Sequence, residues 1–111
     1  MWVLLVWVLL APVTARAEPA LQWHRRAEMN FGVFNAAASR VGEQFVVTGG
    51  LMQSGAAGDW VQVYDIAADR WRAPMQLSIG RCMHAQVTLP DGRVLVAGGQ
   101  TGRVTDKLHA L

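Results

Sequence analysis

Residues 45–50 read FVVTGG and residues 94–99 read VLVAGG. Both stretches are short apolar runs that end in a glycine pair, a pattern typical of a β-strand followed by a tight loop. The motif returns after about 50 residues, a period that indicates a sheet unit of about four strands recurring along the chain. The doubled motif therefore predicts an all-β fold made of repeated antiparallel sheets.

The sequence around the two glycine pairs also favours strands. Residues 60–66 (WVQVYDI) alternate in polarity and are rich in β-branched and aromatic side chains. Residues 90–92 (PDG) predict a hairpin turn, because an Asp-Gly step accepts a positive φ angle at little cost. Residues 20–24 are read as one more short strand, with Trp23 as its apolar anchor. No stretch beyond residue 17 favours a helix.

Aligning the two glycine pairs brings other residues into register. Asn35 and His84 precede their glycine pairs by the same separation in sequence, and the separations for Trp23 and Trp71 differ by a single position. We therefore expect Trp23 to take the place in the first unit that Trp71 takes in the second. On this alignment residues 18–29 are the last strand of a sheet unit, which in a ring of units would complete the final one.

The same alignment applies at the other end of the chain. Residues 109–111 fall where residues 60–62 fall in the first unit, so the sequence stops as a strand begins. About one and two-thirds units are present, whereas a closed ring of such units needs roughly four to eight. The sequence is thus interpreted as an N-terminal fragment whose remaining units lie outside this chain.

Residues 1–17 have the pattern of a secretory signal peptide. Residues 2–10 are wholly apolar, and Ala15-Arg16-Ala17 supplies a site with small residues for cleavage after Ala17. A membrane anchor is the rival interpretation, but spanning a bilayer takes roughly 18 or more apolar residues. Pro12 and Arg16 interrupt the run before that length. We expect export to the periplasm or the extracellular space, with no membrane attachment after cleavage.

The charge and cysteine content limit the classes of partner. The 111 residues carry 10 Lys+Arg and 8 Asp+Glu, a formal net charge of +2, so nothing points to nucleic acid or an anionic membrane. Cys82 is the single cysteine, which excludes a disulfide within the chain. No His/Cys cluster has metal-ligand spacing, and no cofactor is predicted. Cys82 is expected to be a small buried thiol.

Several landmarks taken together resemble the kelch repeat of β-propellers. These are a glycine pair after an apolar strand, Tyr64 with Trp71 seven residues later, and Arg81 ten residues after Trp71. The resemblance extends over residues 20–111. It implies blades of four antiparallel strands, with a closing strand in residues 18–29, a first kelch repeat in residues 30–74 and a truncated second repeat in residues 75–111.

In the kelch family the landmark residues are structural, and their chemistry agrees. The glycine pairs, Gly49 with Gly50 and Gly98 with Gly99, permit close approaches that a Cβ would forbid. Tyr64 and Trp71 supply large ring surfaces, each with a polar edge, and we expect them to pack between one blade and the next. Arg81 is suited to hydrogen-bond loop carbonyls. The first copy departs from the pattern, since residues 28–31 (EMNF) hold no arginine where Arg81 stands in the second.

Residues 44–50 and 91–94 are also similar to the propeller of the galactose oxidase group. That resemblance would imply a copper ion and a tyrosine radical cross-linked to a cysteine. The position of the cysteine falls at about Phe34, and the position of the tyrosine falls at about Met83. Met83 is a poor ligand for oxidised copper and cannot form a phenoxyl radical. The sequence therefore disfavours a copper radical oxidase.

A second enzyme of this fold type, the bacterial N-acetylneuraminate mutarotase, needs only acid and base groups and a cation for the sugar carboxylate. The groups available are Glu28, Asp59, Arg81 and His84, and their spacing implies no site. The sequence favours an exported β-propeller module that binds a protein or a carbohydrate. A sugar mutarotase or epimerase is the alternative, catalysis is left open, and Arg81 and His84 are the candidate ligand contacts.

Overall fold

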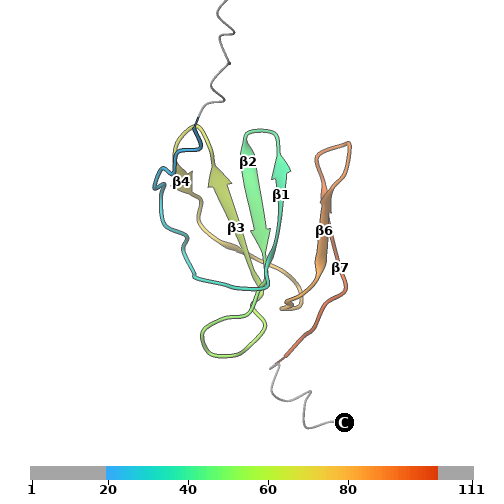
Figure 1. Ribbon diagram of the computed structural model, residues 1–111. Coiled ribbons are helices and arrows are strands. Elements are labelled where there is room, and N and C mark those ends of the chain that lie inside the picture. The colour runs from blue at the N-terminus through green and yellow to red at the C-terminus, as the bar shows by residue number, and fades with distance from the viewer. Residues whose placement is uncertain (1–19, 103–111) are drawn as a thin grey trace, which may run out of the picture.

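The computed structural model describes residues 20–102 of the chain (Figure 1). The expected signal peptide and the strand expected at residues 109–111 lie outside this range. Every regular element in the range is a strand, and all strand pairs are antiparallel. The all-β prediction is confirmed. No helix occurs in residues 20–102, so none there is long and apolar enough to cross a membrane.

The first sheet is a meander whose strands follow one another in the order β1-β2-β3-β4 (Figure 1). Its strands are β1 (Ala37–Val41), β2 (Gln44–Thr48), β3 (Trp60–Asp65) and β4 (Arg70–Trp71), and β5 (Met75–Gln76) also pairs with β3. The central strand β3 corresponds to the alternating stretch read from the sequence. It has neighbours on both sides, and Gln62, Val63 and Tyr64 are its buried residues.

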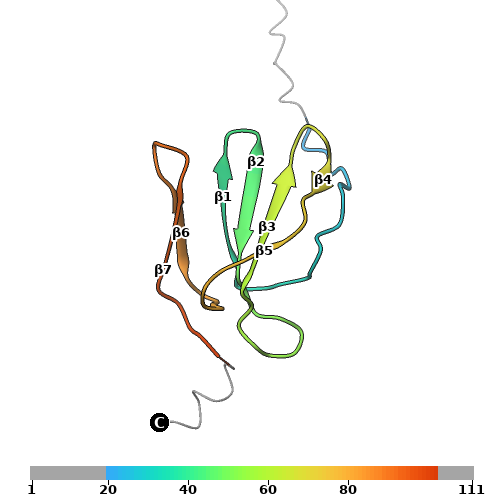
Figure 2. The ribbon, with the colours of Figure 1, turned by 180° about the vertical axis from the view of Figure 1, so that it is seen from behind.

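The second sheet is a hairpin of β6 (Ala85–Thr88) and β7 (Val94–Ala97). It stands beside β1, as both ribbon views show (Figures 1 and 2). The predicted turn at residues 90–92 joins its strands. Gly92 has a φ angle of 85° and donates its N–H to the carbonyl of Leu89, while Asp91 accepts from the Arg93 N–H.

Residues 20–24, which the sequence suggested as a strand completing another sheet unit, form no strand within the described part of the chain. Residues 20–24 have no strand partner, and Trp23 is 99% exposed. Side chains of the sheet hold the following residues instead. The buried Gln62 amide accepts from the N–H of Phe31 and donates to its carbonyl, and the Phe31 ring stacks on Trp60 at 4.7 Å between centroids. The N-terminal segment thus crosses the face of the sheet rather than extending it.

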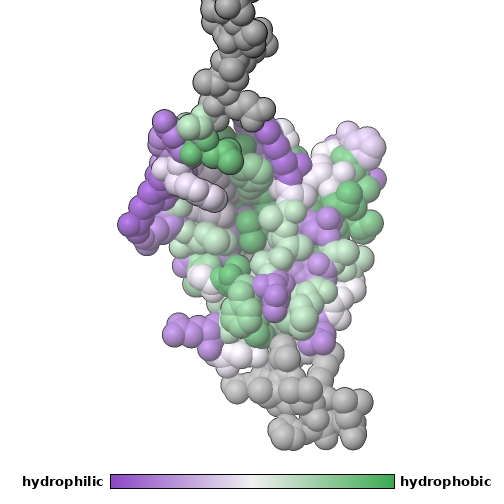
Figure 3. All heavy atoms as spheres, in the orientation of Figure 1, coloured by the Kyte–Doolittle hydropathy of each residue, from purple (hydrophilic) through white to green (hydrophobic). Residues whose placement is uncertain are grey.

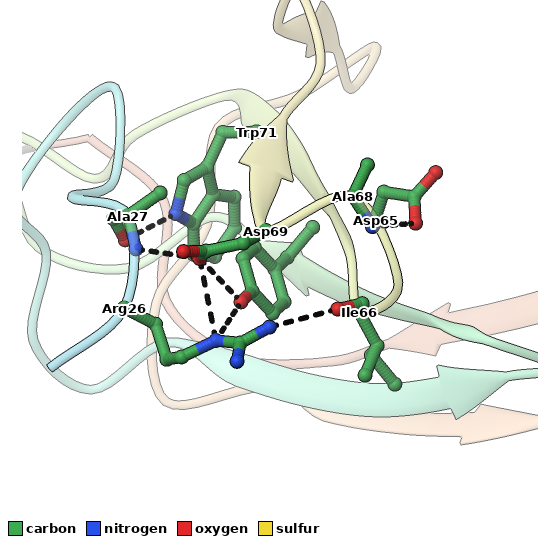
Figure 4. A network of polar contacts seen from close by, with 8 residues as sticks. Arg26, Ala27, Asp65, Ile66, Ala68, Asp69 and Trp71 are labelled. Carbon is green, nitrogen blue, oxygen red and sulfur yellow. Dashed lines mark hydrogen bonds and ion pairs between the residues drawn. The ribbon is translucent and has the colours of Figure 1, made fainter. Parts of the chain in front are cut away.

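A polar network fixes the N-terminal segment to the outer end of the first sheet (Figure 4). The Tyr64 hydroxyl donates to Asp69, and Arg26 donates to the Tyr64 oxygen and lies 3.3 Å from the Asp69 carboxylate. The Ala27 N–H also donates to Asp69, and the Trp71 indole donates to the Ala27 carbonyl. The donors Ala27 and Tyr64 hold the pKa of the Asp69 carboxyl below its usual value.

The two repeats align with a shift of one position from the alignment based on the glycine pairs alone. Asn35 and Met83 both have a φ angle of 53°, so Met83, not His84, corresponds to Asn35. In the first hairpin Ala37 pairs with Thr48, whereas in the second Ala85 pairs with Ala97 and so encloses one more residue. The extra residue lies in the longer turn between β6 and β7. The offset between the repeats is therefore 48 before this turn and 49 after it.

The Trp71 ring was expected to pack between one sheet and the next. In the structure it does not lie between the two sheets. Trp71 pairs with Tyr64 across β3 and β4, and their ring centroids are 5.1 Å apart with the planes tilted by 43°. β1 and β6 make the contact between the sheets. Trp71 therefore links the outer strand to the N-terminal segment.

We predict that Trp71→Ala lowers the free energy of unfolding by about 2–3 kcal/mol. The loss combines an aromatic pair with Tyr64, worth about 0.5–1.5 kcal/mol, a hydrogen bond worth about 1 kcal/mol and some apolar burial. Trp71→Phe, which keeps a ring but removes the donor to Ala27, should cost about 1 kcal/mol. Urea unfolding followed by circular dichroism measures both. Equal losses in the two variants would contradict the role given to the ring.

Candidate functional site

The two sheets meet at a small polar cluster around Thr48, the last residue of β2. Thr48 is 2% exposed, and its Oγ1 lies 2.8 Å from His84 Nε2 and 2.5 Å from Gln86 Oε1. The Gln86 amide nitrogen reaches across to the Ser39 hydroxyl and the Val46 carbonyl of the first sheet. The clustered side chains come from β1, β2 and the start of β6. Hydrogen bonds rather than a strand ladder therefore join the hairpin to the sheet.

The hydrogen bonds fix the proton positions in this cluster. A carbonyl only accepts, so the Gln86 group facing Val46 is the NH₂ and the group facing Thr48 is the oxygen. The Thr48 hydroxyl therefore donates to Gln86. Its oxygen accepts from His84, which must carry its proton on Nε2. The Nδ1 atom is then an unprotonated acceptor, and it is buried without a hydrogen-bond partner among residues 20–102.

The surroundings of His84 favour its neutral form. Desolvation by burial, together with the positive charge of Arg81, lowers the pKa of the His84 imidazole from its ordinary value of 6.5. A hydrogen bond with the backbone of Thr48 raises this pKa and is the smaller effect. A neutral imidazole with a free Nδ1 lone pair can accept a proton or a hydrogen bond.

Gly49 and Gly50 allow the second repeat to approach the first, and Gly99 leaves room for His84 within the second repeat. A Cβ on Gly49 would lie 2.1 Å from the carbonyl oxygen of Arg81 and 2.9 Å from Cε1 of His84. A Cβ on Gly99 would lie 2.7 Å from Cβ of His84. The Gly50 N–H donates to the Arg81 carbonyl at 2.8 Å. His84 therefore lies between the two glycine pairs, and only residues without a side chain leave it that space.

Arg81 contacts the loops as its chemistry suggested. Its Nη1 donates to the carbonyl of Gly98 at 3.1 Å, and its backbone N–H donates to Gly58. Its Nε is buried and has no partner in the part of the chain that the structure describes. Cys82, next to it, is fully buried, as expected for an inert thiol. Arg81 and His84, the two candidate ligand contacts, are thus brought together at one junction.

The other candidate residues from the sequence do not join Arg81 and His84 in one cluster. Glu28 forms an ion pair with Arg25 on the N-terminal segment, and no contact joins it to the junction within residues 20–102. Asp59 follows Gly58, whose carbonyl binds the Arg81 N–H. Phe34 and Met83, where the copper oxidase pattern would need a cysteine and a tyrosine, are both exposed. Residues 20–102 contain no group of three His, Cys, Asp or Glu side chains placed to hold a metal ion.

Sequence reasoning missed three polar residues that are important here, Thr48, Gln62 and Gln86. Gln62 and Thr48 are almost fully buried, and each makes hydrogen bonds to a segment distant in sequence. A polar signal was present, because each lies within or at the edge of a run that contains β-branched residues. Long polar side chains inside such runs are common on exposed strand faces as well, so the pattern alone does not reveal their partners.

Comparison with known proteins adds no family to this description. No protein-family model matches the chain. A search of curated proteins likewise finds no match.

We predict that Gly49→Ala is far more damaging than Gly98→Ala. Both positions have positive φ angles, 59° and 74°, so an alanine costs about 1–2 kcal/mol at either one. At Gly49 the added Cβ also collides with the Arg81 carbonyl, whereas nothing lies within 4 Å at Gly98. The total at Gly49 should reach about 2–5 kcal/mol. Unfolding at micromolar protein concentration measures both losses, and equal values would argue against the close approach.

We also predict that acid weakens the fold through His84. Because its folded-state pKa lies below 6.5, the unfolded state binds more protons as the pH falls through that value. The stability from neutral His84 is complete above pH 6.5 and declines below it, toward the folded-state pKa. The urea midpoint should therefore fall from pH 8 to pH 5, and less steeply in His84→Gln. Titration of the carboxylates changes the stability of the wild type and of His84→Gln alike. Parallel pH profiles of the two proteins would therefore refute the role given to neutral His84.

Proposed function

We propose that this chain is part of an exported β-propeller of the kelch type and serves as a module that binds a protein or a carbohydrate. One observation carries the proposal. A four-stranded antiparallel meander is followed by a hairpin that repeats its first two strands and docks on it through a glycine pair. This is the arrangement expected when sheet units recur along a chain. The low net charge argues against nucleic acid as the ligand.

The loops at one end of the sheets are the surface that we assign to ligand binding. Residues 49–59, 77–84 and 98–102 gather at the same end of the molecule (Figure 1). Backbone hydrogen bonds tie them together, including one from the Ala57 N–H to the Gly102 carbonyl and one from Arg81 to Gly58. Loops held by a rigid sheet are the usual place for binding residues. Arg81 and His84 belong to this end.

Binding is favoured over catalysis because the polar groups at the junction are already in use. His84 bonds to Thr48 and Arg81 bonds to Gly98, so both hold the repeats together. An acid–base pair aimed at a common point is not formed by the residues that the structure describes. One observation keeps the sugar mutarotase as a second candidate: the His84 Nδ1 and the Arg81 Nε have no partner within residues 20–102. A base beside a cation is what an acidic sugar would need.

The experiment separates the two functions. N-acetylneuraminate is added as one anomer, and NMR follows its conversion to the other with and without the protein. We expect the rate to equal that of buffer. The protein should bind at least one ligand in a panel of glycans and peptides. His84→Gln should weaken this binding about tenfold, the loss of one hydrogen bond, while Leu21→Ala, on the exposed N-terminal segment, does not. Faster conversion that is lost in His84→Gln would establish the mutarotase instead.

A further inference from the structure

The turn between β6 and β7 contains an aspartate followed directly by a glycine, Asp91-Gly92. Residues 90–93 are all exposed, and they lie at the opposite end of the molecule from the loops assigned to ligand binding (Figure 1). Figure 3 shows a hydrophilic surface at this tip of the hairpin. The dipeptide is thus separate from the candidate site and open to water.

An aspartate that precedes a glycine can rearrange through its own backbone. The glycine nitrogen attacks the Cγ of the aspartate and a C–N bond forms. One carboxyl oxygen leaves as water, with the amide proton and a second proton from the carboxyl group or the solvent. Water then opens the resulting succinimide ring at either carbonyl, which gives aspartate or isoaspartate. Glycine favours this reaction, because it has no Cβ to shield the nitrogen and its backbone rotates freely.

In the closed turn both reacting groups are engaged. The Gly92 N–H donates to the Leu89 carbonyl at 2.9 Å. The Asp91 carboxylate accepts from the Arg93 backbone N–H at 3.0 Å through Oδ1 and from the Arg93 Nε at 2.7 Å through Oδ2. Attack on Cγ requires the amide to lose its acceptor and the carboxylate to turn away from Arg93. These bonds lie within the turn itself, so they do not depend on a further sheet unit beside the hairpin.

We propose that Asp91 is a modification site, at which isoaspartate forms when the turn opens and which Arg93 protects while the turn is closed. Local opening of an exposed turn requires far less free energy than global unfolding. When the turn closes faster than the succinimide forms, the rate of modification follows the population of the open turn. This modification goes beyond the proposed ligand binding and does not depend on it.

Isoaspartate at this position changes the hairpin as well as the residue. The backbone then runs through the Cβ and Cγ of Asp91, which makes the turn longer. Turn length fixes the register of a hairpin, and here the Leu89 N–H donates to the Arg93 carbonyl at 2.7 Å to close it. Gln86, in the same strand β6, holds the hairpin on the first sheet. Isomerisation therefore loosens the docked hairpin.

Ageing of the full chain in warm neutral buffer tests the proposal. Peptide mapping by mass spectrometry, with a protease that cuts before aspartate but not before isoaspartate, measures the conversion at Asp91. We expect the folded wild type to convert about tenfold or more slowly than the chain in urea. Arg93→Ala removes the Nε contact, keeps the backbone donor and should convert about two- to fivefold faster than the wild type, the effect of losing an exposed ion pair. Circular dichroism checks that this variant is folded.

Arg70→Ala is the matched control, because it removes an exposed cation from β4 and leaves the turn unchanged. Its conversion rate at Asp91 should equal that of the wild type. Equal rates in the folded and the urea-unfolded wild type would overturn the proposal, and so would an Arg93→Ala rate equal to the wild-type rate. Equal acceleration in Arg70→Ala and Arg93→Ala would overturn it as well, since that indicates an effect of net charge and not of the contact.

Discussion

The contact between Gly49 and the segment from Arg81 to His84 determines how the two repeats are arranged. At Gly49 the backbone comes so close to the Arg81 carbonyl that a Cβ would lie 2.1 Å from that oxygen. The Gly50 N–H then bonds to the same carbonyl. A two-stranded hairpin is at best marginally stable alone in water. The β6–β7 hairpin therefore depends on this contact for its position, and with it the site at the junction.

Polar side chains rather than apolar ones make the contact specific. Thr48, His84 and Gln86 form a chain of hydrogen bonds in which each donor has an acceptor. Burying such groups is costly unless their bonds are made. Sliding the hairpin by one residue would turn Gln86 to the solvent and place Ala85 or Val87 against Thr48. The network thus favours one register, which the small apolar area of the hairpin alone would specify poorly.

The strand around Val63 and the turn at Gly92 could be predicted, because both depend on periodicity or backbone conformation within a few residues. The path of the N-terminal segment could not, since it depends on side chains such as Gln62 that bind backbone groups distant in sequence. In the candidate site, Arg81 and His84 could be identified by type but not by geometry. Their place follows from a shift of one position between the repeats. That shift arises in the longer turn between β6 and β7, whose length the spacing of the glycine pairs does not reveal.

Binding and folding are coupled at this junction because the same side chains serve both. A ligand that accepted from Arg81 Nε or donated to His84 Nδ1 would contact groups that also hold the hairpin on the first sheet. Any such ligand stabilises the docked arrangement by mass action, to an extent set by its concentration over its dissociation constant. Conversely, a change at Thr48, which touches no ligand group, weakens binding by loosening His84. Loss of binding in a variant therefore identifies a contact residue only when the docked hairpin is shown to be intact.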